Sequence, residues 1–70
     1  MGDPRLGSRL KEVRMAAGLT QAELAERAGV SRKTINTVEN GVFVPSTLLA
    51  LSLASVLGTS VEELFYLVEH

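Results

Sequence analysis

Apolar positions recur along the chain at helical spacing, and polar or glycine-containing segments separate the runs. The first run has the spacing i, i+4, i+7 and i+11 and consists of Leu6, Leu10, Val13 and Ala17. This stripe predicts an amphipathic first helix. We expect it to end at Gly18, because glycine readily adopts the conformation that stops a helix.

Hydroxyl side chains at helix-start positions predict four further helices. Thr20 and Glu23 match a capping box, in which each side chain accepts a hydrogen bond from the other residue's backbone amide, and Ser60 and Glu63 repeat the pattern. The expected helices begin at Thr20, Ser31, Ser46 and Ser60, and the last two cover 46–57 and 60–68. Glycines follow the first three of them, at Gly29, Gly41 and Gly58.

The segment 42–45, Val-Phe-Val-Pro, interrupts the helical pattern. Its alternation is compatible with a strand, but four residues between two helices favour a loop packed on the core. Every other segment indicates helix, and the connections are short. We therefore predict an all-α fold, a compact five-helix domain that residues 1–70 form as a single unit.

Composition limits the chemistry available to the chain. It has 70 residues, no cysteine and one histidine, His70. A thiol nucleophile, a thiolate metal site and a disulfide are therefore excluded, and neither a histidine-containing catalytic triad nor a multi-histidine metal site is expected. We predict no cofactor, no metal, no small-molecule ligand and no enzymatic activity.

We recognise neither a signal peptide nor a membrane-spanning segment in the sequence. A spanning helix needs about 20 apolar residues, whereas the longest mostly apolar stretch, 48–57, has about ten. We therefore expect a cytoplasmic protein without membrane contact.

Charge is distributed unevenly along the chain. Residues 1–38 contain all seven basic residues and four acidic ones, a net charge of +3. Residues 39–70 contain four acidic residues and no basic one, a net charge of −4. The first half can therefore accept a polyanion that the second half would repel. Chance segregation in a short chain is the alternative to a functional asymmetry.

Residues 20–41 have the features of a helix-turn-helix. The connection around Gly29 is short, glycine can adopt the left-handed turn conformation, and Ala25 is small where the two helices must cross closely. The outward positions of the third helix of the chain are Arg32, Lys33, Asn36 and Thr37, with Ser31 at its cap, and all five side chains can form hydrogen bonds. Such side chains pair with base edges and phosphates, so this face predicts nucleic-acid binding.

A family resemblance rests on motifs that surround this segment. The motifs are Gly18-Leu19-Thr20-Gln21-Ala22-Glu23-Leu24-Ala25, Gly29-Val30-Ser31-Arg32 and Val38-Glu39-Asn40-Gly41. They closely resemble the phage Cro/repressor-like (XRE-type) helix-turn-helix family, and the likeness extends over residues 6–66. It implies a five-helix, lambda-repressor-like DNA-binding domain that acts as a transcriptional regulator and places its third helix in the major groove.

The resemblance also implies roles by position. The residues that would face bases are Ser31, Arg32, Lys33 and Thr37. Gln21 would bind a phosphate and brace the third helix, Asn40 would donate to the DNA backbone, and Asn36 could do either. Arg14 and Glu39 match a family ion pair that links the first helix to the end of the third.

One segment departs from the family pattern. Many relatives carry a basic residue after Asn40-Gly41, near the DNA backbone, where this chain has Val42-Phe43-Val44. The resemblance therefore leaves open a weaker backbone contact at this loop, or a second use of it.

The C-terminal part contains more apolar side chains than so small a domain can easily bury. The candidate dimer residues are Phe65, Tyr66, Leu67 and Val68. Paired helix-turn-helix proteins read two half-sites about 34 Å apart, so we expect a homodimer that binds a palindromic double-stranded DNA operator as a repressor. The alternative is an antitoxin-like or other protein-partner-binding module that uses the apolar C-terminal face.

Overall fold

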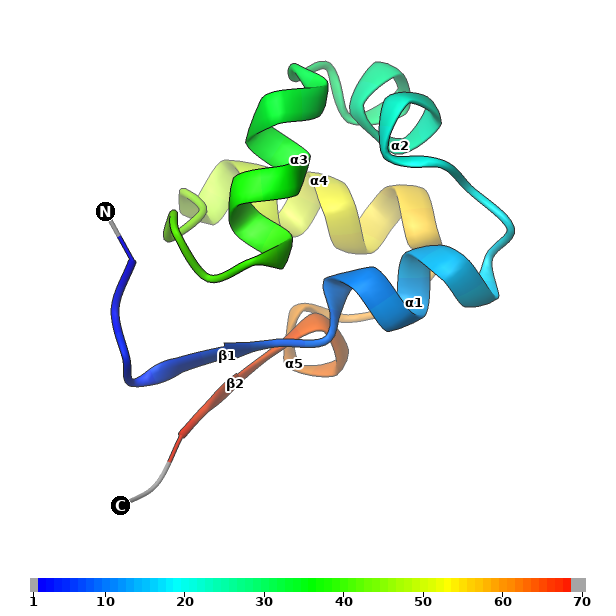
Figure 1. Cartoon of the computed structure of the whole chain (residues 1–70). Helices are drawn as coiled ribbons and strands as arrows, with labels where there is room; N and C mark the ends of the chain where they lie inside the picture. The colour runs from blue at the N-terminus through cyan, green and yellow to red at the C-terminus, as the bar shows by residue number, and fades with distance from the viewer. Residues whose placement is uncertain (1, 69–70) are drawn as a thin grey trace.

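A computed structural model describes residues 2–68 as five short helices and a small two-stranded sheet (Figure 1). The elements are β1 Leu6–Ser8, α1 Leu10–Ala16, α2 Gln21–Ala28, α3 Arg32–Glu39, α4 Thr47–Leu57, α5 Val61–Leu64 and β2 Phe65–Leu67. The five helices of the prediction are confirmed. The sheet was not predicted, so a strictly all-α fold is wrong.

Helices α2 to α5 begin where the sequence places hydroxyl caps, whereas α1 begins after Arg9 without a side-chain cap. The side chains of Thr20, Ser31, Ser46 and Ser60 each accept a hydrogen bond from a backbone amide in the first turn that follows. At Thr20 both halves of the capping box form, because the Glu23 carboxylate also accepts from the Thr20 amide at 2.9 Å. Local chemistry therefore sets the N-terminal ends of α2 to α5.

One apolar core holds the helices together. Its fully buried side chains are Leu10, Leu24, Ile35, Val38, Leu53 and Leu64. They come from all five helices, with α2 packed against both α3 and α4. Burying a Leu, Ile or Val side chain contributes about 1.5–3 kcal/mol each, so this core fixes how α2 and α3 are placed.

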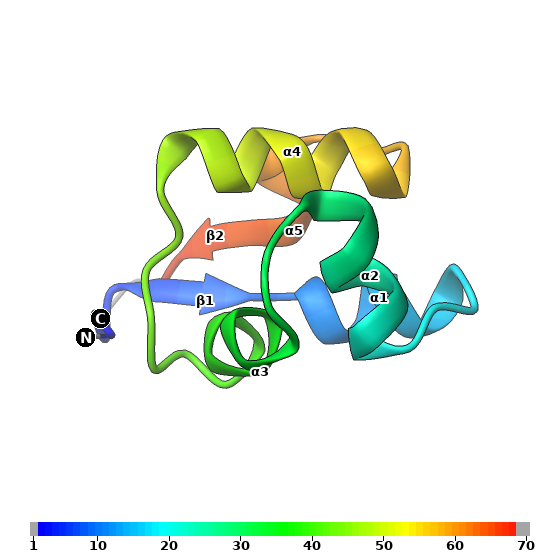
Figure 2. The ribbon, with the colours of Figure 1, turned by 90° about the horizontal axis from the view of Figure 1, so that it is seen from above.

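The sheet replaces the predicted ends of two helices. Leu6 was expected in the first helix and Phe65 in the fifth, but β1 and β2 pair antiparallel, with Leu6 opposite Leu67 and Ser8 opposite Phe65. Helix α5 ends at Leu64, so the predicted helix over 60–68 is wrong beyond that residue. Both views show the sheet at the end of the molecule away from α2 (Figures 1 and 2).

Contacts beside the strands explain why these ends are extended. The Arg9 amide donates to the Leu64 carbonyl at 2.7 Å, and the Val68 amide donates to the Arg5 carbonyl at 2.7 Å. The Tyr66 ring covers Gly7, and the Arg9 guanidinium carbon lies 4.2 Å from the centre of that ring. Cross-strand bonds and a cation–π contact thus stabilise a pairing between the two ends of the domain.

The segment 42–45 forms a loop, as expected, but it does not pack on the core. Val42, Phe43 and Val44 are all exposed. The prediction of a buried loop is therefore wrong, and these apolar side chains are available to a partner.

Candidate nucleic-acid interface

Helix α3 presents a polar side to solvent. Ile35 and Val38 are buried on its inner side, while the predicted base-facing and backbone-facing positions lie outward. The exposed ones are Ser31, Arg32, Lys33, Asn36 and Asn40, and Thr37 is half-buried. The structure therefore places all six of these predicted residues on one accessible surface.

The turn before α3 sets the angle of that surface. Gly29 adopts φ +73°, a left-handed conformation that a β-carbon disfavours. The Val30 amide donates to the Ala25 carbonyl at 3.0 Å, which closes the end of α2 as in a Schellman motif. Ala25 is itself buried, so the two helices approach closely. The tight turn and the small residue together set the angle between α2 and α3, while Ile35 and Val38 keep α3 packed on the core.

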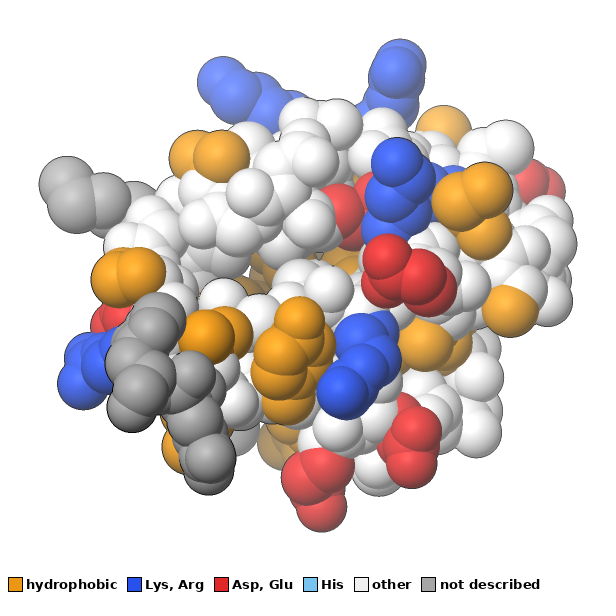
Figure 3. Space-filling view, turned by 60° about the horizontal axis from the view of Figure 1, so that its bottom comes forward, with side chains coloured by type: hydrophobic (Ala, Val, Ile, Leu, Met, Phe, Trp, Pro, Cys, Tyr) orange, Lys and Arg blue, Asp and Glu red, His pale blue; other side chains and the backbone are white. Residues whose placement is uncertain are grey.

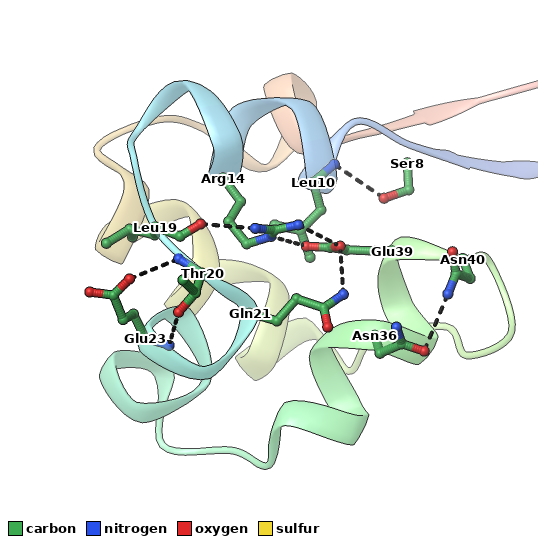
Figure 4. Close-up of polar contacts among 10 residues, drawn as sticks. All are labelled: Ser8, Leu10, Arg14, Leu19, Thr20, Gln21, Glu23, Asn36, Glu39 and Asn40. Atoms are coloured by element: carbon green, nitrogen blue, oxygen red, sulfur yellow. Dashed lines mark hydrogen bonds and ion pairs between the residues drawn. The ribbon is translucent and has the colours of Figure 1, made fainter.

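A buried ion pair fixes the far end of α3. Arg14 of α1 donates from Nε to Glu39 Oε2 at 2.6 Å and from Nη2 to Glu39 Oε1 at 3.2 Å (Figure 4). The same guanidinium donates from Nη1 to the Leu19 carbonyl at 2.8 Å. The Arg14 and Glu39 side chains are only 10% and 1% exposed. The pair thus ties α1, the following loop and α3 into one unit.

Gln21 joins this network from the first turn of α2. Its Nε2 donates to Glu39 Oε1 at 3.0 Å, as Figure 4 shows. This hydrogen bond to the end of α3 supports the bracing role that the family resemblance implies for Gln21. The side chain stays partly exposed and borders two surface depressions that also include Arg32.

The surface next to Gln21 suits an anion. One depression is lined by Gln21, Arg32, Lys33 and Asn36. None of these is acidic, and the nearby Glu39 carboxylate is buried against Arg14. Positive charge without a competing exposed carboxylate is the arrangement that phosphate binding requires.

Local hydrogen bonds limit which contacts three of the polar side chains can make with DNA. Asn40 Nδ2 donates to Asn36 Oδ1 at 3.2 Å, so these amides are oriented as a pair. Thr37 Oγ1 donates to the Thr34 carbonyl at 3.0 Å. Because its proton is used within the helix, the Thr37 hydroxyl can accept from a ligand, and its methyl group is free to make apolar contacts.

Sequence reasoning missed one part of this surface. A second depression, on another side of α3, is lined by Ser31, Lys33, Thr34, Thr37, Val42 and Phe43. Thr34 and the two loop residues were not among the predicted site residues. The departure of the loop from the family pattern was the available signal, but its position beside α3 depends on the fold.

The predicted dimer residues separate into two groups. Phe65 is 8% exposed and belongs to the core, and Val68 is half-buried, whereas Tyr66 and Leu67 are exposed. Phe65 is therefore corrected from an interface residue to a core residue. Figure 3 views the molecule from the sheet side and shows hydrophobic side chains exposed at several places on this face.

Two further features are absent from residues 2–68, the part of the chain that the structure describes. Among them there is no group of three or more histidine, aspartate or glutamate side chains that could hold a metal ion. None of their helices is long and apolar enough to cross a bilayer.

Comparison with known proteins points to one family. A family model described as helix-turn-helix matches residues 10–64. The uncharacterized HTH-type transcriptional regulator YgzD of Bacillus subtilis is 39% identical over 62 residues, 89% of this chain and 94% of that protein. An uncharacterized HTH-type transcriptional regulator of Methanothermobacter thermautotrophicus is 48% identical over 61 residues, 86% of this chain and 88% of the relative.

A solved structure extends the likeness to a protein seen with DNA. The master regulator for biofilm formation SinR, from Bacillus subtilis, was solved in complex with DNA. It superposes with a TM-score of 0.73 at 33% identity, over 77% of this chain and 87% of that one.

Proposed function

The chain belongs to the phage Cro/repressor-like (XRE-type) helix-turn-helix family, and from this premise we propose that it is a transcriptional regulator that binds double-stranded DNA through α3. One observation carries the proposal. The outward side of α3 bears Arg32, Lys33 and Asn36 without an exposed acid among them, and the Arg14–Glu39–Gln21 network holds it rigidly.

We assign the side chains to two tasks. Arg32 and Lys33 can pair with guanine edges in the major groove, and Ser31 and Thr37 can make shorter contacts with bases. We assign Gln21 and Asn40 to phosphates on either side of these bases, and Asn36 can serve either task. Base contacts supply sequence preference, while phosphate contacts fix the position of α3 on the duplex.

We further propose that two copies bind together and repress transcription by covering a promoter. One helix-turn-helix reads few base pairs, so a two-fold pair on a palindromic operator doubles the readout. Leu67, at 77% exposure on β2, with the exposed Val44 and Leu51 on its neighbouring surface, supplies an apolar face for the pair. The function is one of binding in the cytoplasm, without catalysis or a cofactor.

The test is selection from a random pool of duplex DNA, run in parallel with the parent protein, Arg32→Ala and Arg27→Ala. Arg27 is an equally basic, exposed residue of α2 that borders none of the depressions around α3. We expect the parent to enrich a palindrome with half-sites about one helical turn apart. Arg32→Ala should bind it about 5- to 150-fold more weakly with relaxed preference at one position, and Arg27→Ala should match the parent.

Two results would change the assignment. A loss in Arg32→Ala that is equal on every DNA sequence, with a smaller salt dependence, would make Arg32 a phosphate contact. No enrichment by the parent protein at low salt would reject sequence-specific DNA binding, and the apolar C-terminal face would then be tested for a protein partner.

A further inference from the structure

The two depressions beside α3 differ in chemistry. On one side, Gln21, Arg32 and Asn36 make the surface polar and positively charged. The other side is bordered by Val42 and Phe43, which are 58% and 43% exposed. Lys33 lines both depressions, so the apolar one is continuous with the proposed DNA-binding surface.

Backbone hydrogen bonds hold the loop against the end of α3. The Val42 and Phe43 amides both donate to the Thr37 carbonyl, at 2.9 and 3.2 Å. Gly41 allows this reversal by adopting φ +72°. These hydrogen bonds attach the loop to the last turn of α3 and hold the backbone of Val42 and Phe43 beside that helix.

The hydroxyl groups within this depression are already hydrogen-bonded. The Ser31 and Thr34 hydroxyls lie 2.9 Å apart and bond to each other, and Thr37 Oγ1 donates to the Thr34 carbonyl. The hydrogen-bonding demand of these groups is largely met within the helix. The depression therefore offers mainly methyl and ring surface, with one cation and no acid among its lining residues.

We propose that this depression receives the 5-methyl group of a thymine, so that Phe43 and Val42 determine specificity for an A·T pair in each half-site. The thymine methyl is the apolar group that base edges display in the major groove, and apolar side chains recognise it by contact. The inference rests on the proposed DNA binding by α3 and adds an apolar contact from the loop to the base contacts proposed for the side chains of α3.

The test replaces each thymine of the selected operator, one symmetric pair at a time, by deoxyuridine, which lacks only the methyl group. The parent protein should lose about fourfold in affinity per half-site at one position, the factor that corresponds to burying one methyl-sized group. Phe43→Ala should bind the thymine and deoxyuridine operators equally at that position. Met15→Ala, an exposed apolar residue of α1 outside this depression, should keep the discrimination.

The outcomes separate this inference from the proposed function. Tight binding by the parent with no response to deoxyuridine at any position would overturn the inference and leave DNA binding standing. Discrimination that persists in both Phe43→Ala and Val42→Ala would overturn it as well. Failure of the parent to select any DNA would instead overturn the proposed function, and this inference with it. The parent's response to deoxyuridine needs no variant, so a folding defect in Phe43→Ala cannot imitate it.

Discussion

Arg14 connects α1 and the loop after it to the C-terminal end of α3. Its guanidinium contacts both oxygens of Glu39 and the Leu19 carbonyl, in surroundings that leave little access to water. Replacing it by methionine leaves the Glu39 carboxylate buried with Gln21 as its remaining side-chain donor. Removing one partner of a buried ion pair costs about 3–5 kcal/mol, and domains of this size have roughly that much stability in total. We expect Arg14→Met to be largely unfolded at 25 °C, as measured by urea denaturation.

The double variant Arg14→Met with Glu39→Leu is the matched control. It removes both charges, so no carboxylate is left buried without its cation, and apolar replacement of a buried pair is often neutral or stabilising. We expect the double variant to recover most of the lost stability. If Arg14→Met alone were as stable as the parent, the Glu39 carboxylate would have to accept hydrogen bonds from water or from another donor.

The N-terminus of α2 contains a group whose titration contributes to stability. The Thr20 amide donates to the Glu23 carboxylate at 2.9 Å, and this hydrogen bond lowers the pKa of Glu23 below its usual value of 4.5. A lowered folded-state pKa gives stability that is present above the unfolded-state pKa and is lost as pH falls through the folded-state value. Acidification below about pH 4.5 should therefore weaken the start of α2.

Glu23→Gln tests this, because glutamine retains a capping acceptor but does not titrate. We expect the parent to be more stable than the variant at pH 7, and the difference in the free energy of unfolding to shrink as the pH falls below about 4.5. Asp3, whose pKa the Arg5 side chain lowers to about 2 by hydrogen bonding, titrates in both proteins and cancels in the comparison. A difference that does not change with pH would refute a titrating cap.

Strand β1 depends on the absence of a side chain at residue 7. A β-carbon there would overlap the Tyr66 ring, which also stacks on Arg9. Gly7→Ala should therefore displace the ring and destabilise the domain by about 1–2 kcal/mol, from overpacking and the lost cation–π contact. Thermal unfolding would measure the loss.

A double-mutant cycle with Tyr66→Ala identifies the cause. Tyr66→Ala removes the three ring atoms that lie nearest to the added methyl group, and alanine loses less conformational entropy than glycine on folding. The same Gly7→Ala change should then be neutral or stabilising. An equal cost in both backgrounds would place the strain in the backbone rather than in the ring.

The elements show which parts of the fold could be predicted from sequence. Helix starts were predictable because a cap is local: Ser46 and Thr47 lie next to each other, and α4 begins there as expected. The sheet was not, because β1 and β2 have three residues each and lie at opposite ends of the chain. Leu6 and Leu10 are spaced as in a helix, which led to the wrong prediction for Leu6. The strand-forming residues from Phe65 onward did indicate a strand at the other end of the chain.

The candidate site was predictable in a similar way. The outward positions of α3 follow from helical period alone, so Arg32 and Asn36 could be chosen without a structure. The hydrogen bond from Gln21 to Glu39 and the apolar depression next to Thr37 depend on how separate elements pack. Those contacts could be identified only from the folded structure.

The surfaces proposed to bind DNA and a second copy occupy different regions of the molecule. The polar and charged residues proposed to contact DNA lie on α3 and the first turn of α2, whereas the exposed apolar face involves β2, the loop before α4, and α4. This second face includes Val44, Leu51 and Leu67 around partly buried Leu6. Separate surfaces allow two copies to associate without covering the polar side of α3.

Leu67→Asp tests that association, because it places a charge at the most exposed apolar position of the strand without disturbing the core. We expect sedimentation equilibrium to give a weaker dimer, and binding to a two-half-site operator to fall steeply, while affinity for an isolated half-site stays unchanged. Met15→Asp adds the same charge on α1. It should leave dimer strength, operator binding and half-site affinity unchanged. Phe65→Asp is unsuitable, because that side chain is in the core and its loss would unfold the protomer. A parent protein that stays monomeric on DNA would instead mean that one α3 provides the whole readout.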